Sequence, residues 1–256
     1  FLLGGPLGAL IGAALGHNFD KGLDGLDEDV FTRGDQERVQ MAFFTATFAT
    51  MGHVAKADGE VTRDEINLAE SVMSHMSLTA DMRRAAINLF EQGKQPDFPL
   101  HDVIEQFRSE CTRRQNLMRM FIEIQVQAAY ADGSLHPSED RLLLNICQML
   151  GFDEQVYRQI ESLIKASVHG GARSEYRQQN SSPKSAAAMS THDARALLGV
   201  SAGASAAEVK RAYRRAMSQH HPDKLVAKGL PEEMIKLATE KTQKIREAYE
   251  LLKKGG

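Results

Sequence analysis

Residues 205–223 read SAAEVKRAYRRAMSQHHPD, a basic amphipathic segment that runs directly into His-Pro-Asp. Ser205 and Glu208 have the spacing of a capping box, which predicts that a helix starts here. Apolar side chains then recur at helical spacing and predict one buried face: Val209, Ala212, Tyr213, Ala216 and Met217. The flanks and the opposite side carry four cations: Lys210, Arg211, Arg214 and Arg215. The tripeptide His221, Pro222 and Asp223 is therefore expected to be a loop at the end of a basic helix.

Two further helices are predicted around this segment. A short helix is expected from Asp193 to Leu198, closed by Gly199, and a long one from Pro231 to about Leu252. The long helix has four residues that should face inward: Ile245, Ala248, Tyr249 and Leu252. Residues 191–256 are therefore expected to form a small helical domain.

This order of elements resembles a J domain over residues 191–254. The resemblance implies that His221, Pro222 and Asp223 form the loop that triggers ATP hydrolysis by a DnaK-type chaperone. It also implies which side chains dock on the acidic surface of that partner: Lys210, Tyr213, Arg214 and Arg215. A J domain does no chemistry of its own, so no catalytic residue is expected. One departure is Thr242, where J domains usually carry Phe, and it affects a core contact rather than a docking residue.

A short motif occurs twice in the middle of the chain. Ala-Asp-Gly stands at 57–59 and again at 131–133, and a Glu follows each Asp after seven residues. Helical segments are predicted before the copies at 39–56 and 117–130, and after them at 62–76 and 137–150. Both copies are therefore expected to be helix–loop–helix corners in an all-α domain spanning residues 39–168.

The acidic residues of these corners have two alternative interpretations. Asp58, Glu65, Asp132 and Glu139 fit some ligand positions of a calcium loop, but other ligand positions lack carboxylates. One interpretation is that they cap turns and helices. The other is that the two corners pool their carboxylates into one divalent-metal site. The domain resembles the TerB family, which implies a helical bundle of two related halves, sometimes with metal-binding corners. No other cofactor is expected.

The first sixteen residues, FLLGGPLGALIGAALG, carry no charge. A bilayer span needs about 20 apolar residues, so residues 1–16 are interpreted as the C-terminal part of a transmembrane helix. The alternatives are a signal-peptide remnant and a buried Gly-rich loop. Glycines recur every four residues and share one helix face: Gly4, Gly8, Gly12 and Gly16. Such a stripe favours close packing of two helices in lipid, which predicts a homodimer.

Charge and composition divide the rest of the chain. Residues 17–38 are expected to be a juxtamembrane spacer and residues 169–190 a flexible linker. Residues 191–256 hold 13 Lys and Arg against 8 Asp and Glu, whereas the remainder is acidic. The basic domain therefore suits an acidic partner surface. Nucleic acid is not expected, because the basic helix lacks interleaved aromatic residues. The two cysteines fit a reduced compartment, and the scattered histidines do not indicate an enzyme.

The complete order of segments resembles the DjlA family, the membrane-anchored DnaJ-like co-chaperones of Gram-negative bacteria. The resemblance implies a single inner-membrane anchor, a cytoplasmic bulk, dimerisation through the anchor and a link to envelope-stress signalling that controls capsule synthesis. The leading hypothesis is a regulatory co-chaperone that recruits a DnaK-type ATPase to membrane-proximal clients. The alternative is a metal-responsive TerB-type scaffold in which the J domain is auxiliary.

Overall fold

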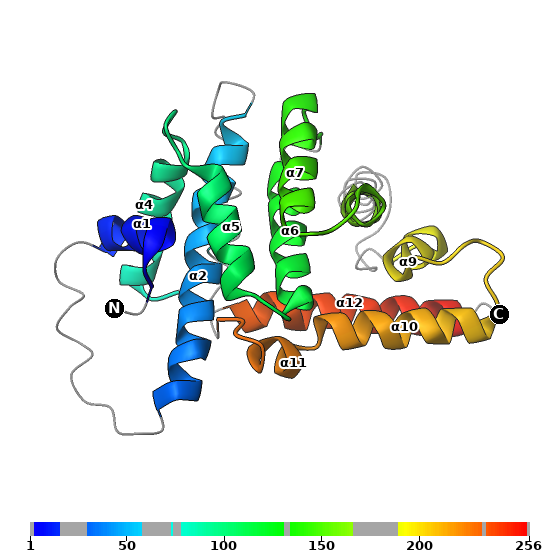
Figure 1. The fold of residues 1–256 in the computed structure, drawn as a ribbon. Coiled ribbons are helices and arrows are strands. Elements are labelled where there is room, and N and C mark those ends of the chain that lie inside the picture. The colour runs from blue at the N-terminus through cyan, green and yellow to red at the C-terminus, as the bar shows by residue number, and fades with distance from the viewer. Residues whose placement is uncertain are drawn as a thin grey trace.

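All regular elements in the described parts of the chain are helices, which confirms the all-α prediction (Figure 1). The computed structural model describes residues 3–15, 30–57, 73, 78–130, 134–165, 189–231 and 234–254. The helices are α1 (Gly5–Leu15), α2 (Val30–Ala55), α4 (Ala80–Gly93), α5 (Leu100–Glu110), α6 (Gln115–Ala129), α7 (Pro137–Met149), a helix at 154–165, α9 (Thr191–Leu198), α10 (Ala206–His220), α11 (Pro222–Val226) and α12 (Ile235–Lys254).

The N-terminal bundle comprises the described helices between residues 30 and 165. Helix α2 lies at its centre and contacts α4, α5, α6 and α7. Three rings from different helices form the middle of the core: Phe43 lies 5.9 Å from Phe107 and 6.4 Å from Phe121 between ring centroids. All three side chains are fully buried, so the helices share one apolar core.

Two glycines allow α2 and α4 to cross at very short distance. A Cβ atom on Gly52 would overlap the carbonyl oxygen of Phe90, and one on Gly93 would overlap the carbonyl oxygen of Ala49. Backbone carbonyls cannot move aside without moving their helix. The missing side chains are therefore a condition for this helix packing.

Helix α2 begins at Val30, whereas the sequence predicted a polar spacer as far as residue 38 and a helix from Val39. The prediction was wrong here because residues 34–38 carry few apolar side chains and show no buried face of their own. Gln36 instead donates a hydrogen bond to the carbonyl oxygen of Val226, 190 residues away. This first part of the helix is therefore stabilised by contact with a distant domain. Helical periodicity in the sequence cannot reveal such a contact.

Helix α1 packs on α4 and α5 of the bundle. Leu7, Ile11 and Ala14 are buried there. Side-chain amides of the bundle bond to its backbone: Gln106 accepts from the Leu7 N–H at 2.9 Å, and Asn88 donates to the Ala14 carbonyl at 3.0 Å. Helix α1 is 11 residues long, and none of the described helices has the length and apolarity required to cross a membrane.

The C-terminal domain comprises residues 189–254 and is built on a hairpin of α10 and α12, with α9 packed against α12 (Figure 1). Its own core contains the residues predicted from the sequence: Ala212, Ile245 and Ala248 are buried, and Tyr249 and Leu252 pack against them. Gly199 ends α9 in a left-handed conformation with φ 66°, as expected for a C-terminal glycine. Helix α12 begins at Ile235 instead of Pro231.

Both cysteines are buried thiols without a disulfide, as predicted. Cys111 lies at the end of α5 and Cys147 within α7. Burial raises the pKa of the Cys111 thiol to about 12 and that of the Cys147 thiol to about 11. Both are therefore protonated near neutral pH and act as small core residues.

Candidate functional site

The His-Pro-Asp tripeptide forms an elbow between α10 and α11. A residue before proline is disfavoured in helical conformation, and His221 accordingly leaves the helix with φ −61° and ψ 125°. Pro222 then starts α11, where its missing N–H costs nothing. The side chain of Asp223 is 90% exposed and that of His221 is 42% exposed. The elbow thus presents a carboxylate to solvent on a short, fixed segment of chain.

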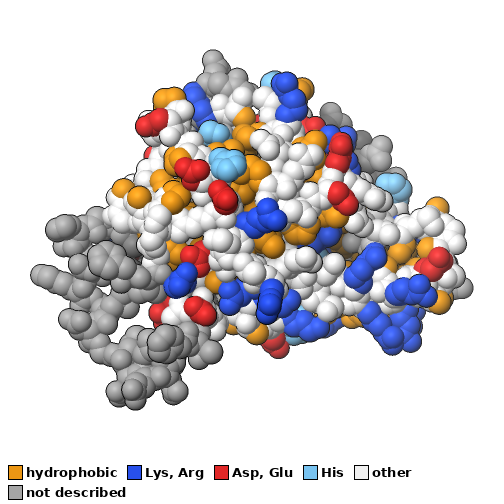
Figure 2. Space-filling model, in the orientation of Figure 1, with side chains coloured by type: hydrophobic (Ala, Val, Ile, Leu, Met, Phe, Trp, Pro, Cys, Tyr) orange, Lys and Arg blue, Asp and Glu red, His pale blue; other side chains and the backbone are white. Residues whose placement is uncertain are grey.

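The predicted cations lie along α10 beside this elbow. Lys210, Arg214 and Arg215 are exposed, and Figure 2 shows Lys and Arg side chains gathered along the edge where the α10–α12 hairpin lies. The capping box predicted at the start of α10 is present, since Ser205 and Glu208 bond reciprocally. Tyr213 differs from the other predicted docking residues, because its ring stacks on Tyr249 at 4.3 Å between centroids. One of its faces is therefore part of the hairpin core.

An apolar contact joins the segment that follows the elbow to the N-terminal bundle. Leu225, Leu230 and Met234 are fully buried and belong to the same core cluster as the bundle residues. Gly229 has φ +96°, and a Cβ atom placed on it would lie 2.6 Å from Cγ1 of Val39 in α2. The elbow segment is thus seated directly on the first half of α2.

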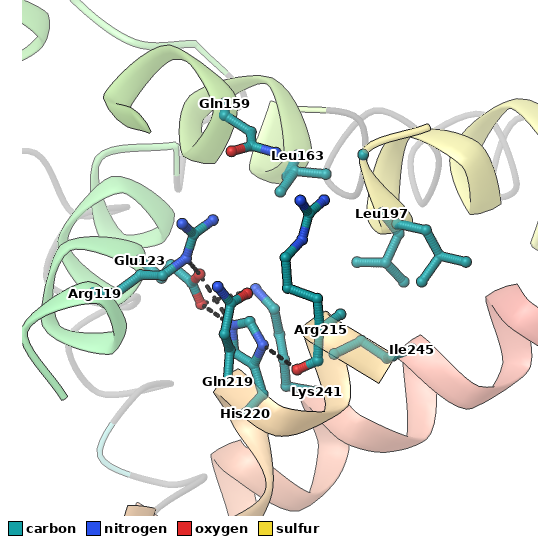
Figure 3. Close-up of a pocket in the computed structure, with 13 residues that line it drawn as sticks. Arg119, Glu123, Gln159, Leu163, Leu197, Arg215, Gln219, His220, Lys241 and Ile245 are labelled. Atoms are coloured by element: carbon teal, nitrogen blue, oxygen red, sulfur yellow. Dashed lines mark hydrogen bonds and ion pairs between the residues drawn. The ribbon is translucent and has the colours of Figure 1, made fainter. Parts of the chain in front are cut away.

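A charged contact, here called the interdomain cluster, joins the two domains at the C-terminal end of α10 (Figure 3). It consists of Glu123 and Arg119 from α6, His220 from α10 and Lys241 from α12. The Nε2 atom of His220 lies 3.0 Å from each carboxylate oxygen of Glu123. Lys241 Nζ lies 3.2 Å from Glu123 Oε2, and Arg119 Nε lies 3.2 Å from Oε1. One carboxylate therefore faces three basic side chains.

Glu123 is nearly inaccessible, with 9% of its side chain exposed. Burial by itself raises the pKa of this carboxyl, but attraction to His220, Lys241 and Arg119 and the His220 hydrogen bond outweigh burial and hold its pKa well below the usual range. The ring of His220 faces acceptors on both sides, because Nδ1 lies 2.9 Å from the Ala216 carbonyl oxygen.

A small cavity of about 120 Å³ lies between the domains next to this cluster. Its walls come from α6, the helix at 154–165, α9, α10 and α12. In Figure 3 the guanidinium of Arg215 extends from α10 toward Gln159 and Leu163 of the bundle. One of the predicted docking cations is therefore turned toward the bundle.

Sequence reasoning did not single out the interdomain cluster. A signal was present, because Glu123 stands inside the run Phe121-Ile122-Glu123-Ile124-Gln125 on a helix in which most positions are buried. A carboxylate at a buried position needs a cationic partner. The partner could not be read from the sequence, because His220 is 97 residues away.

The four proposed metal ligands are only partly within the described structure. Asp58, Glu65 and Asp132 lie outside the described residues. The carboxylate of Glu139 accepts a hydrogen bond from the His136 backbone at 2.9 Å, and together these residues cap the start of α7. The capping interpretation therefore describes this position, and a shared metal site remains a prediction.

The glycines of the N-terminal stripe are also only partly described. Gly4 precedes α1, Gly8 and Gly12 lie within it, and Gly16 is outside the described residues. A Cβ atom on Gly4 or Gly12 would meet no neighbour within 4 Å. Dimerisation through the stripe stays a prediction.

Comparison with known families divides the chain as the fold does. The family model of the tellurite resistance protein TerB matches residues 44–162, and that of the DnaJ domain matches residues 194–255. The model of the co-chaperone DjlA transmembrane domain matches residues 1–26. These three matches agree with the resemblances derived from the sequence.

Several relatives match this chain over almost its whole length. The co-chaperone protein DjlA of Vibrio cholerae is 46% identical over 94% of this chain and 89% of its own length. Those of Photobacterium profundum and Coxiella burnetii are each 42% identical over 99% of this chain, and over 94% and 93% of their own lengths. No solved structure matches this chain.

Proposed function

Because this chain belongs to the DjlA family of co-chaperones, we propose that its J domain stimulates ATP hydrolysis by a DnaK-type chaperone. The family is regulatory rather than catalytic. The J domain acts by binding, so the ATP and the hydrolytic machinery belong to the partner.

The exposed elbow beside a row of cations is the observation that supports this proposal. Lys210 and Arg214 on the rigid helix α10 attract an acidic partner surface and fix its orientation. Pro222 restricts the backbone, so the elbow loses little conformational entropy on binding. Asp223, 90% exposed, then pairs with a cation of the partner. Stimulation follows because this contact is stronger in the hydrolysing state of the ATPase than in its resting state.

A single-turnover ATPase assay with a DnaK-type chaperone tests the proposal. The wild-type chain should accelerate hydrolysis. Asp223→Asn and His221→Gln should abolish the acceleration while far-UV circular dichroism and the unfolding midpoint stay unchanged, because both side chains are at least 42% exposed. Acceleration by either variant equal to that of the wild type would refute the role of the elbow.

In this proposal, the position of the protein at the membrane determines which clients it reaches. The N-terminal segment anchors the chain in the inner membrane as a single-pass homodimer with its bulk in the cytoplasm, and the TerB-like bundle selects membrane-proximal clients. Support comes from the match of residues 1–26 to the DjlA transmembrane domain. These clients are proposed to belong to the envelope-stress pathway that controls capsule synthesis. Affinity capture from membranes of the source cell, with Asp223→Asn as bait to hold complexes, would identify them.

A metal-responsive scaffold is the second candidate, supported by the duplicated acidic corners at 57–65 and 131–139. Calorimetry of the whole chain with calcium, zinc and manganese salts tests it. A site shared between the corners predicts saturable binding that Asp58→Asn and Asp132→Asn each remove. Unchanged heats in both variants would rule the shared site out.

A further inference from the structure

We infer that the TerB-like bundle is an intramolecular partner of the J domain, and that it holds the J domain in a docked state that competes with the DnaK-type chaperone. Glu123 is the residue that maintains this state. The inference rests on the proposed function, because it assigns a regulation to the same elbow and basic helix.

Two separate contacts hold the elbow from both sides. Ahead of it, His220 is bonded to Glu123 of α6 through both carboxylate oxygens at 3.0 Å. After it, the Val226 carbonyl accepts a hydrogen bond from Gln36 at 3.2 Å. The two positions are only six residues apart, and the tripeptide His221, Pro222 and Asp223 lies between them. The bundle therefore constrains the segment that the partner must engage.

Geometry makes the docked state unfavourable for the partner. Arg215 is one of the predicted docking cations, yet it lines the cavity between the domains and extends toward Gln159 and Leu163 (Figure 3). Gln219 and His220, further along α10, line the same cavity. A partner that uses Arg215 must occupy space next to the helix at 154–165. Lys210, Arg214 and Arg215 are all exposed, so an initial encounter remains open, while complete docking around Arg215 requires the bundle to withdraw.

The interdomain cluster suits a reversible contact because its charges do not balance. Glu123 is one anion facing Arg119, His220 and Lys241, and Arg215 borders the same cavity. Attraction to one carboxylate is what keeps these cations together. Removing one partner of a buried ion pair leaves the others buried and uncompensated, which strongly destabilises the contact. An acidic group of a partner that competes for these cations has the same effect.

The test compares the full-length chain with variants on the bundle side only, so that the J domain itself is unaltered. Glu123→Gln keeps the shape and removes the charge. Gln36→Ala removes only the hydrogen bond to Val226 and leaves the bundle core intact. Glu91→Gln is the matched control, because Glu91 is 55% exposed in a surface ion pair with Lys94. Hydrogen exchange reports docking through the amides of residues 216–231, and the single-turnover assay reports stimulation.

Both bundle variants should increase exchange over residues 216–231 and lower the co-chaperone concentration that gives half-maximal stimulation. If about nine in ten molecules are docked, release raises the apparent affinity for the chaperone about tenfold. Glu91→Gln should match the wild type in both measurements.

Unchanged exchange in Glu123→Gln would overturn the docked state. Increased exchange without stronger stimulation would overturn the competition while leaving the proposed function intact. If neither the wild type nor any variant stimulated ATP hydrolysis, the proposed function would be refuted. Hydrogen exchange would still test the docked state in that case.

Discussion

The Nε2 atom of His220 lies 3.0 Å from both carboxylate oxygens of Glu123, and the residue after His220 begins the His-Pro-Asp elbow. A carboxylate of the TerB-like bundle thus contacts the residue next to the segment that the chaperone is proposed to recognise. This contact gives the bundle a direct physical connection to the J domain.

The contribution of Glu123 to stability should depend on pH. The pKa of this carboxyl is held well below its ordinary value, so its stabilising effect is fully present above the ordinary carboxyl pKa of about 4.3. The effect is lost as pH falls through the lowered pKa, where the folded protein takes up the proton. The difference in unfolding free energy between wild type and Glu123→Gln should therefore shrink as pH falls below about 4. Urea denaturation at each pH measures it, and an equal difference at about pH 3 would contradict the assignment.

Gly52→Ala should destabilise the bundle although alanine is the better helix former. The new Cβ would overlap the Phe90 carbonyl of α4, and separating two packed helices costs about 1–3 kcal/mol. Gly34→Ala in the same helix is the control, because a Cβ there meets no neighbour within 4 Å. That variant should gain up to about 1 kcal/mol. Thermal denaturation compares the two, and equal midpoints would show that the close crossing does not govern the packing.

Tyr157→Phe should cost about 1 kcal/mol through the loss of one buried hydrogen bond. The hydroxyl of Tyr157 donates to the Asp140 carboxylate at 2.8 Å and joins the helix at 154–165 to α7. A double-mutant cycle with Asp140→Ala isolates this bond from the ion pair between Asp140 and Arg158. Urea denaturation of the four proteins gives the coupling energy. Strictly additive effects would mean that the hydroxyl contributes nothing through Asp140.

The glycine stripe should govern dimerisation in lipid. Apolar burial does not drive helix association inside a bilayer, so close backbone approach at Gly8 and Gly12 must supply it. Gly8→Leu combined with Gly12→Leu should reduce crosslinked dimer in membranes while insertion is retained, since leucine favours the bilayer. Carbonate extraction checks insertion. A dimer yield equal to that of the wild type would place the interface elsewhere.

Local signals in the sequence were enough to predict most elements of the J domain. The capping box at Ser205, the left-handed glycine at 199 and the proline that ends α10 each act within a few residues. Helical periodicity likewise predicted side chains of α10 and α12 that form the core of this domain or pack against it, among them Ala212, Ile245 and Ala248. These features are determined by backbone sterics and by short-range hydrogen bonds, so neighbouring residues suffice to specify them.

Tertiary structure alone decided which surfaces meet. Periodicity predicts that one face of a helix is buried, but it does not identify the element that covers it. The early start of α2 at Val30, the crossing at Gly52 and the pairing of Glu123 with His220 all depend on residues that are far apart in sequence. A glutamate within an apolar run indicates that a cation lies near it, because burying a charge without a partner is costly. Only the packing of the two domains determines that the cation stands next to the elbow.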